Sequence, residues 1–174
     1  KLSSAHEASQ ETSKHGYSKR IFTDGTGQSL VYYLYIPSNY HSYHKYPLVL
    51  LLHGDGEKSN PKKTAAQNQT ALLKQLYVRV WTSAYSAPNN PQIQQRWPCF
   101  VVVPQITASQ QWINVSLHKG FYMQGFYVQK RRPAIGLLMT MHLLDALQRE
   151  YSGIDTNRRY ITGISSGAFG VWDA

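Results

Sequence analysis

The sequence predicts an α/β domain in which a mixed, mostly parallel sheet carries helices on both faces. Two β-rich runs near the start, residues 18–23 and 28–36, flank a glycine turn that is typical of a hairpin. Two continuous apolar runs, 47–52 and 100–103, have the composition of strands buried on both faces. In the segments that follow these runs, apolar residues recur at helical spacing, and this spacing predicts the helices.

The first of these segments predicts a helix over residues 64–81, because Leu72, Leu73, Leu76 and Val80 fall on one face. A loop over 87–98 should then lead to the second buried strand.

Later boundaries follow from prolines and glycines. Pro104 is expected to stop the second buried strand, and a long irregular connection should run to Pro133. A second amphipathic helix around 137–147 should end near Gly153. The last strand is predicted over 158–164, and Ala168 begins the last helix.

The chain is long enough for one domain, which we place at residues 16–174. Residues 1–15 are polar and lack an apolar period, so we expect a flexible polar tail there. No apolar run reaches about 18 residues, and no transmembrane segment is expected.

The formal net charge of +9 is compatible with an acidic partner. The basic residues form only short groups, such as Lys62-Lys63 and Lys130-Arg131-Arg132, so we expect a solvated surface and no nucleic-acid partner. The single cysteine, Cys99, excludes an internal disulfide, and its apolar neighbours favour a buried thiol. No metal or organic cofactor is expected, because neither a cluster with ligand spacing nor a glycine-rich phosphate loop occurs.

The segment Gly163-Ile164-Ser165-Ser166-Gly167 matches the G-x-S-x-G pattern of a nucleophilic serine. The pattern gains weight from its place between an apolar strand and a predicted helix. Gly163 and Gly167 would let strand and helix pass closely, while the turn exposes Ser165 Oγ above the sheet. The amide of Ser166 would then donate to a developing oxyanion. The alternative is a serine in an ordinary strand-to-helix loop.

A second motif, His53-Gly54-Asp55-Gly56, directly follows the first buried strand. Acyl transfer needs two donors on one oxygen, and the second normally comes from the loop after the third strand. We assign this donor to the Asp55 amide, with Gly54 and Gly56 shaping the loop. Alone, the motif is also compatible with an ordinary strand ending; together, the two motifs are more specific.

Three segments carry a family resemblance: "YPLVLLLHGDGEKSN", "FVVVPQ" and "LLDALQREYSGIDTNRRYITGISSGAFGVWD". They resemble the α/β-hydrolase fold, specifically the carboxylesterase branch with polyhydroxybutyrate-depolymerase-like and feruloyl-esterase-like secreted enzymes. The resemblance covers about residues 17–174 as the N-terminal half of that fold. It implies that Ser165 is the nucleophile, that Ser166 and Asp55 supply oxyanion amides, and that His53 braces the loop rather than acting as base.

The resemblance also implies a serine esterase that cleaves small or polymeric carboxylic esters through an acyl-enzyme. A small-ester carboxylesterase and a polyester or feruloyl depolymerase remain open within this class. Four aromatic residues either line the acyl pocket or pack in the interior without a role in binding: Trp112, Phe121, Tyr122 and Tyr127. A secreted location is favoured, although the acceptor motifs at Asn68 and Asn114 do not decide the compartment.

Two features depart from the family pattern. Ser166-Gly167-Ala168 stands where the family usually has methionine or alanine followed by two glycines. In this fold the order is serine, acid, histidine, yet only Asp173 and no histidine follow Ser165. We therefore expect the acid and histidine beyond Ala174, a fold truncated after the serine turn, and an incomplete, inactive fragment.

Such a truncation would leave the last strand as an unpaired apolar edge, so we expect a partner chain or the missing C-terminal half to cover it. A noncatalytic binding protein on a hydrolase scaffold is the alternative function, and a peptidase-like member of the same fold is a smaller alternative.

Overall fold

The computed structural model describes residues 16–82, 93–116, 128–129 and 132–174. The predicted tail over 1–15 and three of the four candidate pocket aromatics, Phe121, Tyr122 and Tyr127, lie outside the described residues.

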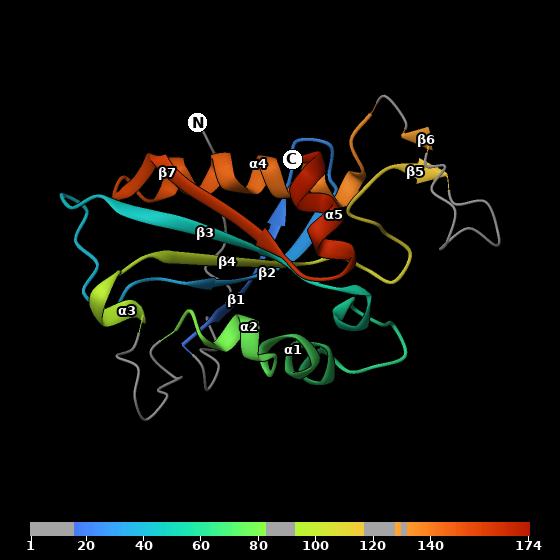
Figure 1. The fold of residues 1–174 in the computed structure, drawn as a ribbon, viewed down its shortest axis with the longest axis horizontal. Helices are drawn as coiled ribbons and strands as arrows, with labels where there is room; N and C mark the ends of the chain where they lie inside the picture. Colours follow the sequence, from blue (N-terminus) through green and yellow to red (C-terminus); the bar gives the residue numbers. More distant parts are fainter. Residues whose placement is uncertain (1–15, 83–92, 117–127, 130–131) are drawn as a thin grey trace.

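The strands and helices alternate much as the sequence predicts (Figure 1). The strands are β1 (Ser18–Thr23), β2 (Ser29–Tyr35), β3 (Tyr46–Leu52), β4 (Phe100–Gln105), β5 (Val115–Ser116), β6 (Val128–Gln129) and β7 (Ile154–Gly163). The helices are α1 (Ala65–Leu73), α2 (Leu76–Arg79), α3 (Ile93–Arg96), α4 (Ile135–Glu150) and α5 (Ser166–Asp173), with one 3₁₀ turn, η1 (Asp55–Glu57).

The main sheet has the order β1-β2-β4-β3-β7. Its first two pairings, β1 with β2 and β2 with β4, are antiparallel, whereas β3 pairs in parallel with both β4 and β7. The mixed α/β sheet that the sequence predicts is therefore confirmed. A separate two-stranded ribbon joins β5 and β6.

Helices cover both faces of the main sheet: α4 and α5 lie on one side, α1 and α2 on the other (Figure 1). Alternate residues of the central strands divide between two apolar clusters. One contains Leu48, Leu50 and Leu52 with residues of α4, and the other contains Val49 and Leu51 with residues of α1 and α2. Burial on both faces explains why β3 is a continuous apolar run.

The predicted single helix over 64–81 is wrong in one respect, because the helix breaks between α1 and α2. Gln75 is extended, with φ −64° and ψ 136°, and its side chain donates to the Ala71 carbonyl at 3.0 Å. The restart rotates the helix phase, so that Val78 is buried while Leu76 is 56% exposed. Leu72 and Val78 both reach the same apolar cluster.

Pro104 does not stop β4, which continues to Gln105. At Pro104 the strand pairs with Tyr32 of β2, whereas its pairing with β3 extends only to Val102. Proline has no N–H to donate to a neighbouring strand. Because β3 is no longer paired with β4 at this position, no hydrogen bond between β4 and β3 is lost. The short helix α3 lies within the predicted loop over 87–98, and the last strand starts four residues earlier than predicted.

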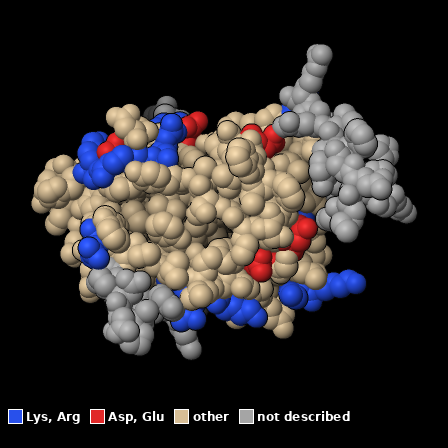
Figure 2. All heavy atoms as spheres, viewed as in Figure 1, with Lys and Arg blue, Asp and Glu red and all other residues tan. Residues whose placement is uncertain are grey.

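Among the residues that the structure describes, strand β7 lies at the edge of the sheet and pairs only with β3. Large apolar side chains with exposed surface lie nearby: Tyr160 on β7, Ile164 directly after it, and Phe169 and Trp172 on α5. The described residues include no helix of the length and apolar character needed to cross a membrane. In the view of Figure 2 the Lys and Arg side chains form several separate groups rather than one continuous patch.

Candidate active site

The turn between β7 and α5 holds Ser165 in an uncommon backbone conformation. Its φ is 52° and its ψ is −123°, and among the described residues it is the one non-glycine residue with positive φ. Such a conformation is strained and persists only where the surroundings hold it. Ser165 itself is exposed, so its side chain does not point into the packed interior.

Two glycines make the turn sterically feasible. A Cβ atom on Gly163 would lie 2.5 Å from the Gly167 carbonyl oxygen. A Cβ atom on Gly167 would overlap the Leu52 carbonyl and lie 2.7 Å from the His53 carbonyl oxygen. Strand β7, helix α5 and the end of β3 therefore meet backbone to backbone, and any larger residue would push them apart.

The loop after β3 lies directly beside the serine turn. A Cβ atom on Gly54 would be 3.3 Å from Ser165 Cβ and 3.6 Å from the Ile164 carbonyl oxygen. The two motifs, far apart in the chain, thus meet at the carboxyl ends of neighbouring parallel strands. This is the edge at which open α/β sheets place their ligands.

Main-chain N–H groups are available on both sides of this contact. Among the residues that the structure describes, no acceptor is bonded to the amide of Asp55 or to that of Ser166. Asp55 opens η1 and Ser166 opens α5, where the first N–H groups have no intrahelical partner. These are the amides that the sequence assigns to an oxyanion.

His53 is fully buried beneath this loop. The Ile106 amide donates to its Nε2 at 3.2 Å, so Nδ1 carries the proton and donates to the Gly54 carbonyl at 2.7 Å. Burial lowers the pKa of His53 to about 4, and the nearby Lys58 contributes to the lowering. With both ring nitrogens occupied and the ring neutral, His53 braces the Gly54 backbone and is not available as a base.

The side chain of Asp55 is held by Lys58, whose Nζ lies 2.7 Å from Asp55 Oδ1. The hydrogen bond from Lys58 is the main reason that the pKa of Asp55 is lowered, and the neighbouring Ser166 hydroxyl contributes to the lowering. Lys58 Nζ also donates to Gln111 Oε1 at 3.0 Å. The exposed end of the loop is therefore fixed from two directions. Gly56, whose Cβ position is open, contributes no close contact.

Two residues that support the loop belong to neither sequence motif. Trp112 is buried and donates from Nε1 to the His53 carbonyl at 2.8 Å, so it packs in the core and braces the loop. Gln105 donates to the carbonyl oxygens of Glu57 and Asn68 and accepts from Tyr33, which connects the loop to α1. The only available signal is a buried polar residue at a strand end, which must find partners.

No described histidine is placed to activate Ser165. His41 and His44 lie before β3, His142 is exposed on α4, and His53 is committed to the loop. Among the described residues there is also no group of three or more His, Cys, Asp or Glu side chains suited to a metal ion. Cys99 is buried as predicted, and burial raises the pKa of its thiol to about 11.

A comparison with protein-family models gives no match, and a comparison with curated protein sequences gives none either. Solved structures do match. A thermostable esterase superposes on 90% of this chain with a TM-score of 0.63 and 28% identity. A ferulic acid esterase from Anaeromyces mucronatus, in complex with ferulic acid, covers 97% of the chain with a TM-score of 0.48 and 14% identity.

The chain spans 36% of the length of the thermostable esterase. The mixed sheet with helices on both faces agrees with that match. The chain therefore has an α/β-hydrolase fold that is related to esterases.

Proposed function

We propose that this chain supplies the nucleophile and oxyanion elements of a serine hydrolase acting on carboxylic esters. Ser165 Oγ attacks the ester carbonyl, and the Asp55 and Ser166 amides bind the oxyanion. The ester C–O bond then breaks, the protonated alcohol leaves, and water hydrolyses the acyl-enzyme to release the acid. A complete cycle also needs a base and an acid, which this fold normally supplies after the serine. A peptidase-like reaction is the smaller alternative within the same chemistry.

The observation that carries the proposal is the strained Ser165 backbone next to the Gly54 loop. A serine held at φ 52° costs folding free energy, on the order of 1–3 kcal/mol, without improving core packing, since the residue is exposed. The close approach of Gly54, 3.3 Å from its Cβ position to Ser165 Cβ, brings the second amide-bearing loop to the same place. Strain together with free amides favours an acyl-transfer site over an ordinary loop.

Fluorophosphonate labelling of the gene's full-length product tests the proposal. We expect one labelled peptide, carrying the phosphonate on Ser165, and hydrolysis of a short-chain p-nitrophenyl ester. Ser165→Ala should abolish both signals. Ser166→Ala is the matched control in the same peptide; it retains the main-chain amide and should retain labelling.

Circular dichroism confirms that each variant is folded. A folded full-length product that neither labels at Ser165 nor hydrolyses the ester would reject the esterase proposal. The noncatalytic binding protein on the same scaffold would then be the better account.

A further inference from the structure

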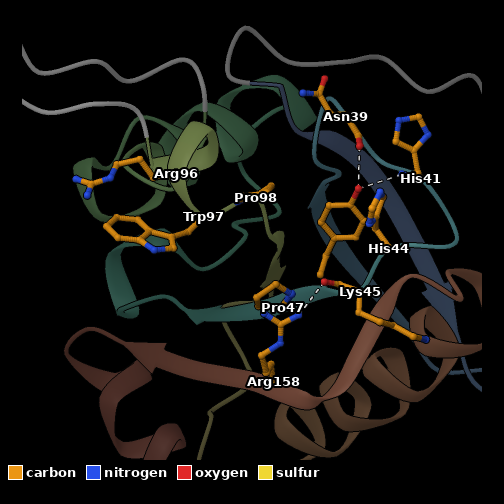
Figure 3. Close-up of a pocket in the computed structure, with 10 residues that line it drawn as sticks. Asn39, His41, His44, Lys45, Pro47, Arg96, Trp97, Pro98 and Arg158 are labelled. Carbon is orange, nitrogen blue, oxygen red and sulfur yellow. Dashed lines mark hydrogen bonds between the residues drawn. The ribbon is translucent and has the colours of Figure 1, made fainter.

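A surface hollow, here called the amino-end hollow, lies at the opposite end of the parallel strands from Ser165. It encloses about 500 Å³ and is formed by three segments: the loop that leads into β3, the connection from α3 to β4, and the first half of β7 (Figure 3). Arg158 and Ser165 are seven residues apart along an extended strand and its turn, so the two sites are separated by roughly 20 Å. The hollow is therefore not part of the candidate active site.

The hollow is basic. Lys45, Arg96 and Arg158 are among its lining residues, and none of the lining residues is a carboxylate. Lys45 extends away from Trp97 in Figure 3 and donates to the Ser152 carbonyl at 2.7 Å. The two arginines are therefore the cations that a ligand in the hollow would meet.

Arg158 is held in place by its neighbours. Its Nε donates to Asp155 Oδ2 and its Nη2 donates to the Lys45 carbonyl, each at 2.7 Å. Among the described residues no acceptor is bonded to the remaining nitrogen, Nη1. A guanidinium that is already oriented and keeps both N–H groups of Nη1 free is suited to bind an oxyanion, because little side-chain freedom is lost on binding.

Part of the lining of the hollow is apolar. Trp97 is 60% exposed, an unusual state for so large an apolar ring, and the Arg96 guanidinium stacks on it with 4.8 Å to the ring centroid. Pro47, Pro98 and Tyr46 complete the apolar lining, and Figure 3 shows Arg158 and Pro47 between Trp97 on one side and His44 on the other. Arg96 has no carboxylate partner among the described residues.

We propose that this hollow is a binding site for an aromatic carboxylate, whose ring lies against Trp97 while its carboxylate is bound by Arg158; Arg96, stacked on Trp97, adds a second positive charge to the lining. The ring would cover apolar surface that is now exposed to water. The carboxylate would supply negative charge to a lining that holds three cations and no carboxylate, although Asp155 beside the hollow already pairs with Arg158. The site needs neither Ser165 nor the loop at Gly54, so an experiment can reject it without rejecting the proposed hydrolase activity, and the reverse.

Sodium benzoate is a suitable probe, titrated into ¹⁵N-labelled protein while the indole Nε1–H signals are followed by NMR. The Trp97 signal should move and saturate. The Trp112 signal, whose Nε1–H is bonded to the His53 carbonyl, should stay in place. Acetate lacks the ring and benzyl alcohol lacks the charge, so each should bind at least tenfold more weakly than benzoate.

Arg158→Gln should weaken benzoate binding at least fivefold. Arg159→Gln is the matched control, because it removes the same charge one residue further along β7, where the side chain points to the other face. Arg96→Gln provides a second test in case Arg158→Gln unfolds, since Arg96 has no ion pair among the described residues. Equal weakening by Arg158→Gln and Arg159→Gln would overturn the proposal, as would acetate binding as tightly as benzoate or the absence of saturation.

Discussion

The two ends of the parallel strands are built from different chemistry. At the carboxyl ends, Gly54, Gly163 and Gly167 remove side chains so that main-chain groups meet around Ser165. At the amino ends, arginine and tryptophan side chains line the amino-end hollow. A site built from main chain tolerates almost no added atom, whereas a site built from exposed side chains tolerates their removal. The comparison predicts opposite sensitivities to mutation.

The two tryptophans of these regions should give the largest contrast. Trp112 is 1% exposed and bonded to the His53 carbonyl, so Trp112→Ala should lower the free energy of unfolding by about 3–5 kcal/mol. Trp97 is 60% exposed, so Trp97→Ala should change it by less than about 1 kcal/mol. Urea unfolding measures both. Similar losses for the two variants would show that the hollow at the amino ends is also a packed core.

The next largest change in the free energy of unfolding is expected from a methyl group added at the serine turn. Gly167→Ala places a Cβ against the carbonyl of Leu52, the last residue of β3, and that of His53 directly after it. Both are main-chain groups, which cannot turn aside as a flexible side chain can. We expect a loss of about 3 kcal/mol, at the upper end for overpacking. Gly56→Ala, in the neighbouring loop with open space around its Cβ position, should stay within about 0.5 kcal/mol. A small effect at Gly167 would mean that the turn is loose.

The pH dependence of stability should report on His53. The unfolded chain takes up a proton near pH 6.5, but the folded chain does so only near the lowered pKa of about 4. The free energy of unfolding should therefore fall as the pH drops from 6.5 toward 4, by about 2 kcal/mol between pH 7 and pH 5.

His53→Gln does not titrate and should show a flatter profile over the same range, in which free carboxylates remain largely ionised. Chemical denaturation at several pH values makes the comparison. Parallel profiles for the two proteins would remove His53 as the neutral brace of the Gly54 loop.

The smallest expected effect concerns the strained serine. Ser165→Gly should raise the free energy of unfolding by about 1 kcal/mol, because glycine adopts positive φ readily and loses little packing at an exposed position. Ser165→Ala keeps the strain and should change stability by less than half of that. Thermal unfolding distinguishes the two variants, and a destabilised glycine variant would show that Ser165 is not strained.

The class and order of the elements could be predicted from local pattern. Alternation and glycine chemistry predicted the β1–β2 hairpin, and continuous apolar runs predicted β3 and β4. The helix break at Gln75 could not be predicted, because each half alone has helical spacing and only contact with the sheet favours the rotated restart. Pro104 was misread for a related reason, since its effect depends on which neighbour lies beside it.

The candidate site shows the same division. The motif residues Gly163, Ser165 and Gly167 could be selected from the sequence, because the steric demand of the turn is local. The supports at Trp112, Gln105 and Lys58 could not, since each acts through partners that lie far away along the chain or carry no motif. The amino-end hollow also joins segments that no motif connects.

The sequence by itself determined the periodicity of strands and helices and the two places where the backbone must come close, because both depend on residues that are neighbours in the chain. Only the tertiary structure decided how closely Gly54 approaches Ser165, which partners occupy both ring nitrogens of His53, and that two arginines share a hollow with Trp97. Those outcomes depend on distances between distant segments, which the packing of the sheet sets.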